Sequence, residues 1–281
     1  MSEMNGANGV NGMSGIIKVK SASYARYEEL LLKRDNIRKQ AFQYQREYTA
    51  EFGDLIIAVF EKKIECIRKK KTIEYCQRDI NHGRTVDELK LQEYLRKEMA
   101  EFQKQLRSLT DDVANARRRG EVSEMEALQI KKIYRRLAKQ IHPDMNPAVA
   151  DSEELQDLWQ RVVVAYACNQ LNELEELEVL VNKALERIGF DKLDKEIPNI
   201  DSKIVDLENE IERIMRTDPY TYKLLLDDPD AVEEKRNSLK EELKSYEEYS
   251  FQLEEILQNL LGKGAYGKGR AKFVRELLGC Y

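Results

Sequence analysis

The chain has 281 residues and a net charge of −5, and 35% of its residues are charged whereas only 8% are aromatic. This composition, with five prolines and none before Pro143, favours an all-α fold built from long helices. The interspersed charges argue against a nucleic-acid-binding protein, and the longest strongly apolar run, residues 55–60, is too short to span a membrane.

The first third of the chain predicts one long helix. Residues 1–15 are small and polar, and we expect a disordered tail there. Over residues 24–80 the apolar side chains fall near one stripe, which predicts a helix about 85 Å long that needs a partner for this stripe. Gly83 fits a helix C-cap, and Thr85 with Glu88 predicts a capping box that opens the next helix.

A second helix is expected to pair with the first. Its apolar residues are alternately four and three positions apart, which is typical of a coiled coil, and the short loop before it predicts an antiparallel hairpin over residues 20–118. Cations followed by Gly120 end this helix, and Ser123 with Glu126 predicts a capping box for the next one. The alternating residues are Leu95, Met99, Phe102, Leu106, Leu109 and Val113.

The third predicted helix has two distinct faces and ends at a proline. Tyr134 and Leu137 belong to its apolar face, and a cationic stripe runs separately along the same helix. Because Pro143 disfavours helical geometry at the residue before it, we expect His142, Pro143 and Asp144 to form an exposed turn. The cationic stripe consists of Lys132, Arg135, Arg136 and Lys139.

Helices are also predicted after this turn. Asp151 with Glu154 can cap a helix whose Trp159 and Tyr166 pack back against the preceding one, and the pattern continues to Ile188. We expect residues 171–261 to form a helical or coiled-coil region that includes a second hairpin. Residues 262–281 predict a Gly/Lys-rich connector and a short amphipathic tail. No segment of the sequence predicts a β-strand.

The sequence Tyr134-Arg-Arg-Leu-Ala-Lys-Gln-Ile-His-Pro-Asp-Met-Asn-Pro147 resembles the J-domain of co-chaperones that stimulate DnaK-type heat-shock ATPases. The resemblance covers about residues 124–170, and we take 119–170 as the J-domain-like segment. An Ala-Tyr pair in the next helix also matches. The chain departs from the family in lacking a Leu-Gly-Val-like first helix, and Asn169 stands where a leucine is usual.

The resemblance implies a docking role and no enzymatic activity in this chain. In J-domains the tripeptide and the basic helix bind the ATPase, and the hydrolysis takes place in that partner. Carried over to this sequence, the partner-binding residues are His142, Pro143, Asp144, Lys132, Arg135, Arg136 and Lys139.

Metal and cofactor sites are not expected. The chain has four cysteines, and they form no Cys-x-x-Cys pair, which favours a reduced, cytoplasmic chain without a zinc site. Residues 262–267 formally match Gly-x-Gly-x-x-Gly, but they follow a predicted helix rather than a strand, and we therefore reject a nucleotide site. The cysteines are Cys66, Cys76, Cys168 and Cys280.

Two functional hypotheses remain. In the first, the chain is a co-chaperone whose partners are a DnaK-type ATPase and a client or scaffold held by the coiled-coil arms, and neither nucleic acid nor a membrane is a partner. In the second, it is a structural coiled-coil scaffold whose J-like hairpin no longer engages the ATPase. The apolar stripes would also suit a coiled-coil homodimer, and the sequence leaves the client and the oligomeric state open.

Overall fold

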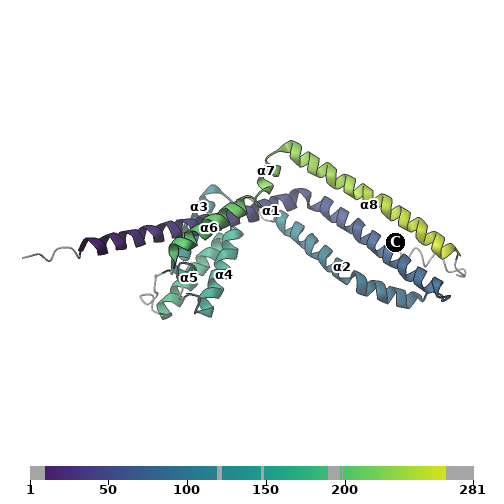
Figure 1. Cartoon of the computed structure of the whole chain (residues 1–281), viewed down its shortest axis with the longest axis horizontal. Helices are drawn as coiled ribbons and strands as arrows, with labels where there is room; N and C mark the ends of the chain where they lie inside the picture. The colour runs from purple at the N-terminus through teal and green to yellow at the C-terminus, as the bar shows by residue number, and fades with distance from the viewer. Residues whose placement is uncertain (1–9, 119–121, 147–148, 189–196, 198, 264–281) are drawn as a thin grey trace, which may run out of the picture. The chain divides into compact units, whose positions relative to one another are not determined.

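The structure, a computed structural model, describes residues 10–118, 122–146, 149–188, 197 and 199–263. These residues contain helices and turns and no β-strand, and the all-α prediction is confirmed. The helices are α1 (Val10–Asn81), α2 (Glu88–Arg118), α3 (Glu124–Ile141), α4 (Glu153–Ala167), α5 (Leu171–Ile188), α6 (Ile200–Met215), α7 (Tyr222–Leu226) and α8 (Pro229–Lys263) (Figure 1).

The chain divides into two compact units, and α1 contributes to both of them. The first unit comprises Met1–Gln45 and Gly120–Lys223, and the second comprises Arg46–Arg119 and Leu224–Tyr281. The segments predicted from the sequence followed the order of the chain, whereas the two units interleave. As a result, α6 belongs to the first unit and α8 to the second, although the sequence predicted a hairpin between these regions.

The core of the first unit is formed by α3, α4 and α5 together with residues of α1 and α6. Tyr134 on α3 stacks on Tyr166 of α4 with ring centroids 3.8 Å apart, and its ring also lies 5.8 Å from that of Trp159. The predicted packing of α4 against α3 is thus confirmed. The α1 residues in this core are Tyr27, Leu30, Leu31 and Ile37.

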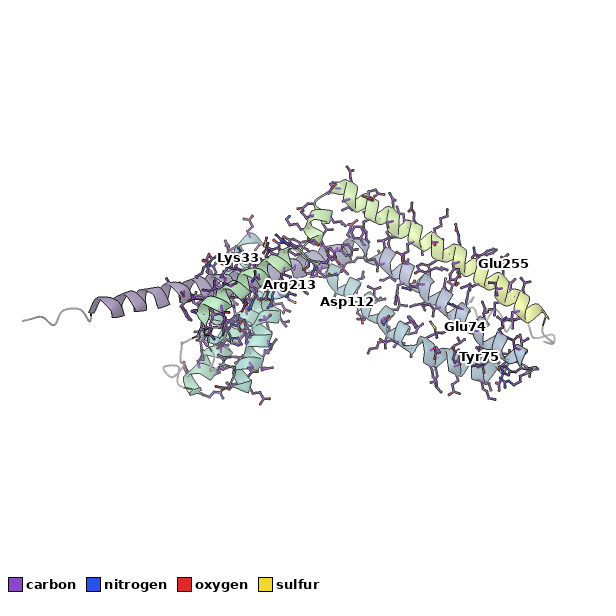
Figure 2. The ribbon with its side chains drawn as sticks, in the orientation of Figure 1. Lys33, Glu74, Tyr75, Asp112, Arg213 and Glu255 are labelled. Atoms are coloured by element: carbon purple, nitrogen blue, oxygen red, sulfur yellow. The ribbon has the colours of Figure 1, made fainter. Side chains whose placement is uncertain are left out.

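The second unit packs residues 46–81 of α1 with α2 and α8. Tyr75 of α1 (labelled in Figure 2) packs on Tyr94 of α2. Their ring centroids are 5.3 Å apart. Lys69, also on α1, is only 5% exposed, and its ammonium group contacts Ser250 at 2.8 Å and Glu254 at 3.0 Å. A buried charge with this many partners links α1 to α8, since each partner offsets part of the loss of hydration.

The helix ends agree with the sequence at some positions and differ at others. Gly83 follows α1 with φ +66°, as the predicted C-cap requires. The capping box predicted at Thr85 is wrong, because α2 begins at Glu88 and the side chain of Asp87 accepts the Lys90 amide at 3.2 Å. Ser152 caps α4 by accepting the Leu155 amide, one residue after the predicted Asp151.

The prediction that α4 continues to Ile188 is wrong, because the chain turns sharply at Asn169. This residue has φ +53°, in the left-handed region that asparagine tolerates better than most residues. The Asn169 amide donates to the Tyr166 carbonyl at 3.2 Å, and the Gln170 amide donates to the Ala165 carbonyl at 2.9 Å. These two hydrogen bonds form a Schellman motif, which ends α4 and reverses the chain into α5.

The two ends of the chain are covered only in part. Residues 1–9 of the predicted tail lie outside the described residues, whereas residues 10–15 belong to α1, which corrects the prediction for that stretch. The predicted C-terminal connector and tail begin at residue 262, and residues 264–281 likewise lie outside the described part of the chain. Within the described ranges, no helix is long and apolar enough to cross a membrane.

Candidate functional site

The candidate site is the turn between α3 and α4, and local sequence explains how it forms. The predicted capping box is present at the start of α3: Ser123 Oγ accepts the Glu126 amide at 3.3 Å, and a Glu126 carboxylate oxygen accepts the Ser123 amide at 3.1 Å. At the other end, His142 has φ −66° and ψ 122°, an extended conformation that ends the helix, as Pro143 predicts.

Asn146 closes the turn against the end of α3. Its backbone amide donates to the His142 carbonyl at 2.9 Å. Its side-chain amide donates to the carbonyls of Lys139 at 3.2 Å and Gln140 at 2.9 Å, two of the acceptors that the end of a helix leaves unpaired. The asparagine of the J-like sequence therefore has a local structural role, which is to hold the turn to the helix before it.

His142 does not lie on an exposed turn, and this part of the sequence-based prediction is wrong. The residue is 2% exposed, and its side chain packs on Trp159, with ring centroids 4.6 Å apart. Nδ1 accepts the backbone amide of Asp144 at 3.0 Å, while Nε2 lies 3.5 Å from Oδ2 of Asp35. Because Nδ1 accepts this hydrogen bond, we place the ring hydrogen on Nε2, which faces the Asp35 carboxylate and also lies 3.2 Å from Nη2 of Arg34. Asp144 itself remains 48% exposed at its side chain.

Two adjacent residues of α1, Arg34 and Asp35, cover the turn. The Arg34 guanidinium donates to Oδ1 of Asp35 through Nε at 3.0 Å and Nη2 at 2.9 Å, and it reaches Oδ2 of Asp144 through Nη1 at 3.2 Å. Tyr134 donates its hydroxyl hydrogen to Oδ2 of Asp35 at 2.7 Å. Helix α1 thus contacts the predicted docking turn through a buried polar cluster, which we call the Arg34 cluster: Arg34, Asp35, Tyr134, His142 and Asp144.

The electrostatics of this cluster favour its charged form. Burial alone raises the pKa of the Asp35 carboxyl, but the hydrogen bond from His142 and the charge of Arg34 outweigh burial and bring this pKa below its ordinary value. Burial lowers the pKa of Arg34, but the charge of Asp35 and its hydrogen bond, together with the charges of Asp144 and Glu210, outweigh burial and raise this pKa above its ordinary value. Burial, followed by the Asp35 charge, raises the pKa of the Tyr134 hydroxyl, which therefore stays a hydrogen-bond donor.

The four residues of the cationic stripe are exposed, but other helices form ion pairs with two of them. Arg136 forms an ion pair with Glu178 of α5, with 2.6 Å between Nε and the carboxylate. Lys139 forms one with Glu28 of α1 at 2.7 Å. Lys132 and Arg135 also lie on the surface, and the described part of the chain offers neither of them an ion pair.

A cleft of about 340 Å³ opens beside the turn, between α1 and α4. Pro143, Phe42 and Val163 contribute apolar surface to its lining, and Lys39 contributes a cation. The Lys39 ammonium lies 4.0 Å from the centre of the Tyr166 ring. Burial, followed by the charge of Lys131, lowers the pKa of Lys39 to about 8. These α1 residues were absent from the predicted site.

Arg34 and Asp35 were not predicted as site residues, although the position of Asp35 in the sequence is unusual. Asp35 is four positions after Leu31 and therefore falls on the apolar stripe of α1. A carboxylate on a stripe that is otherwise buried needs a polar partner in the core. The sequence indicates that such a partner is required, but it does not indicate that the partner is the His-Pro-Asp turn.

Metal-ligand clusters and cysteine thiols are other groups that could carry chemistry. Among the described residues, no group of three or more His, Cys, Asp or Glu side chains is placed to hold a metal ion. Of the cysteines that the structure describes, Cys66 and Cys76 are buried, and both belong to the core of the second unit. Comparison of the chain with family models, curated proteins and solved structures yields no match.

Proposed function

We propose that this chain is a non-enzymatic, cytoplasmic J-domain-like co-chaperone that recruits a DnaK-type heat-shock ATPase through α3 and the following turn. The observation that carries the proposal is the combination of a His-Pro-Asp turn between two packed helices with exposed cations on the first helix. Lys132 and Arg135 project into solvent without an ion-pair partner among the described residues, and they are available to an acidic surface.

The second unit would hold the client or scaffold in this proposal. On α2 the apolar stripe is only partly covered: Leu95, Met99 and Val113 are buried, whereas Phe102, Leu106 and Leu109 are half-buried. Half-buried apolar residues in a continuous row suit a helical partner, which could be a client or a second copy of the chain.

A second candidate function is favoured by the burial of His142. If the Arg34 cluster is permanent, the turn is a structural joint between α1 and the α3–α4 hairpin, and the chain is a scaffold that does not engage the ATPase. Both functions use the same fold. They differ in whether exposed residues of α3 affect ATP hydrolysis by the partner.

The test is single-turnover ATP hydrolysis by the DnaK-type ATPase of the same organism, with increasing amounts of the full chain. We expect the double charge reversal Lys132→Glu/Arg135→Glu to raise the concentration for half-maximal stimulation by about tenfold, because steering and docking both depend on charge complementarity. These side chains are exposed, and the fold should persist. His142→Gln is a poorer variant, since it would also disturb a buried contact.

The matched control is Lys240→Glu/Lys244→Glu on α8, which makes the same change in net charge on exposed residues of the second unit. It should stimulate the ATPase as the wild-type chain does. Equal effects of the two double variants would point to nonspecific charge attraction and contradict the proposal. So would a complete lack of stimulation, both by the wild-type chain and by the Arg34→Gln/Asp35→Asn variant described below.

A further inference from the structure

We infer that α1 is an intramolecular latch: Glu28, Arg34 and Asp35 occupy the surface of the hairpin with which the ATPase would dock. The inference rests on the proposed function and adds its regulation. It predicts that the chain exists mainly in a latched state of low activity, and that weakening these contacts increases activity.

Helix α1 contacts the polar groups of the turn directly. Arg34 pairs with the Asp144 carboxylate at 3.2 Å, and Asp35 faces Nε2 of His142 at 3.5 Å. His142 and Asp144 are two of the three residues of the His-Pro-Asp tripeptide. The His142 ring is buried and cannot contact a partner at the same time, and the Asp144 carboxylate is already paired with Arg34, so docking must compete with the latch.

Helix α1 also forms an ion pair with the cationic stripe. Glu28 binds Lys139 at 2.7 Å, and Glu28 lies seven residues before Asp35, on the same face of the helix. One face of α1 therefore contacts both parts of the predicted docking surface with complementary charge. The acidic residue Glu28 pairs with Lys139 of the stripe, and the basic residue Arg34 pairs with Asp144 of the turn.

Helix α1 is held in the first unit by apolar contacts, whereas its contacts with the turn are polar. Leu30 and Leu31 are almost fully buried in the core of the first unit and anchor α1 there. The contacts of Glu28, Arg34 and Asp35 with the turn and the stripe are polar, and they can be exchanged for water or for a partner without exposing that apolar core. We therefore expect unlatching to free the side chains of His142 and Asp144, while α1 and the buried Met145 stay in place.

The variant that releases the latch is Arg34→Gln/Asp35→Asn. It removes both charges of the α1 pair, keeps a polar side chain at each position and leaves the tripeptide intact. The control is Glu29→Gln/Lys33→Gln, which removes one charge of each sign from exposed positions of the same helix segment (Lys33 is labelled in Figure 2). Glu28→Gln is a milder second variant, because it frees Lys139 without leaving an unpaired charge in the core.

Two measurements on the full chain are required: hydrogen exchange at the Asp144 amide, which is bonded to His142, and single-turnover stimulation of the ATPase. The release variant should exchange faster at Asp144 and should reach half-maximal stimulation at about a tenfold lower concentration than the wild type, because a larger fraction is competent to dock. Glu28→Gln should give a shift of about two- to threefold, and the control should match the wild type.

The outcomes separate the latch from the proposed function. Equal stimulation by wild type and both release variants would overturn the latch and leave the co-chaperone function standing. Unchanged exchange at Asp144 in the double variant would also overturn the latch. Faster exchange without stimulation by any form of the chain would overturn the co-chaperone function, and the latch with it, in favour of the scaffold.

Discussion

The Asp35 carboxylate is buried, yet each of its oxygens has a polar partner. Oδ1 accepts two hydrogen bonds from Arg34, and Oδ2 accepts one from Tyr134 and faces His142. A buried ion pair adds little net stability unless hydrogen bonds satisfy the remaining acceptors, and loss of one partner is then costly. The Arg34 cluster therefore fixes how α1 packs on the turn more than it adds to the total stability.

Tyr134→Phe tests this description at the level of one atom. The change removes the hydroxyl that donates to Asp35 at 2.7 Å and keeps the aromatic packing on Tyr166. We expect the free energy of unfolding to fall by about 1.5–3 kcal/mol, since the lost hydrogen bond has a charged acceptor. Urea unfolding followed by the fluorescence of Trp159, the single tryptophan, measures it in the first unit.

Tyr24→Phe is the matched control for this substitution, because Tyr24 lies on α1, the helix that carries Asp35, and its hydroxyl makes no hydrogen bond among the described residues. Its unfolding transition should remain close to that of the wild type. An equally stable Tyr134→Phe protein would contradict the assignment of the Tyr134 hydroxyl as a partner of Asp35.

At the scale of the elements, α1 and α2 approach each other closely at Gly53. A Cβ atom placed on Gly53 would lie only 2.5 Å from Cγ2 of Val113 and 2.9 Å from its Cγ1. Such distances are shorter than any normal contact, and glycine is therefore needed here for helix packing, although it is a poor residue for the middle of a helix.

Gly53→Ala should destabilise the second unit for this reason. We expect a net loss of about 1–2 kcal/mol, because the overpacking penalty exceeds the roughly 1 kcal/mol that alanine gains in helix propensity. Thermal unfolding followed by circular dichroism measures the loss. In a double-mutant cycle, Gly53→Ala should no longer destabilise a Val113→Ala background, and simple additivity of the two changes would contradict the close approach.

The sequence predicts elements well where the deciding interactions are local. The Ser123–Glu126 capping box, the end of α3 before Pro143 and the C-cap at Gly83 each depend on a few neighbouring residues, and each is confirmed. The break at Asn169 was missed because the apolar pattern runs through it, although asparagine is a common residue at the end of a helix.

The exposure of the candidate site could not be predicted in the same way. Whether His142 is free depends on Arg34, which is 108 positions away, and on the packing of α1 against the hairpin. Sequence periodicity shows that α1 has an apolar face that must be buried, but it does not show which other helix packs against that face. The residue types of the site were therefore predictable, whereas their burial was not.

At the scale of the whole molecule, α1 is shared between two cores that are otherwise built from different parts of the chain. Its residues Leu30 and Leu31 belong to the core of the first unit, and Cys76 belongs to that of the second. The J-like segment predicted as residues 119–170 is thus only part of a unit. It lacks α1, α5 and α6, which all contribute buried side chains to the same core.

This arrangement predicts that residues 119–170 do not fold by themselves. The isolated segment should show low helicity and a solvent-exposed Trp159, because short helices need tertiary packing to form in water. Residues 119–223, which retain α5 and α6, should be helical but should leave Trp159 open to a fluorescence quencher, and a peptide of residues 22–45 should restore its protection. A cooperative unfolding transition and native-like Trp159 fluorescence in the short segment would show instead that the hairpin is self-sufficient, and that α1 is an addition to a complete domain rather than part of its core.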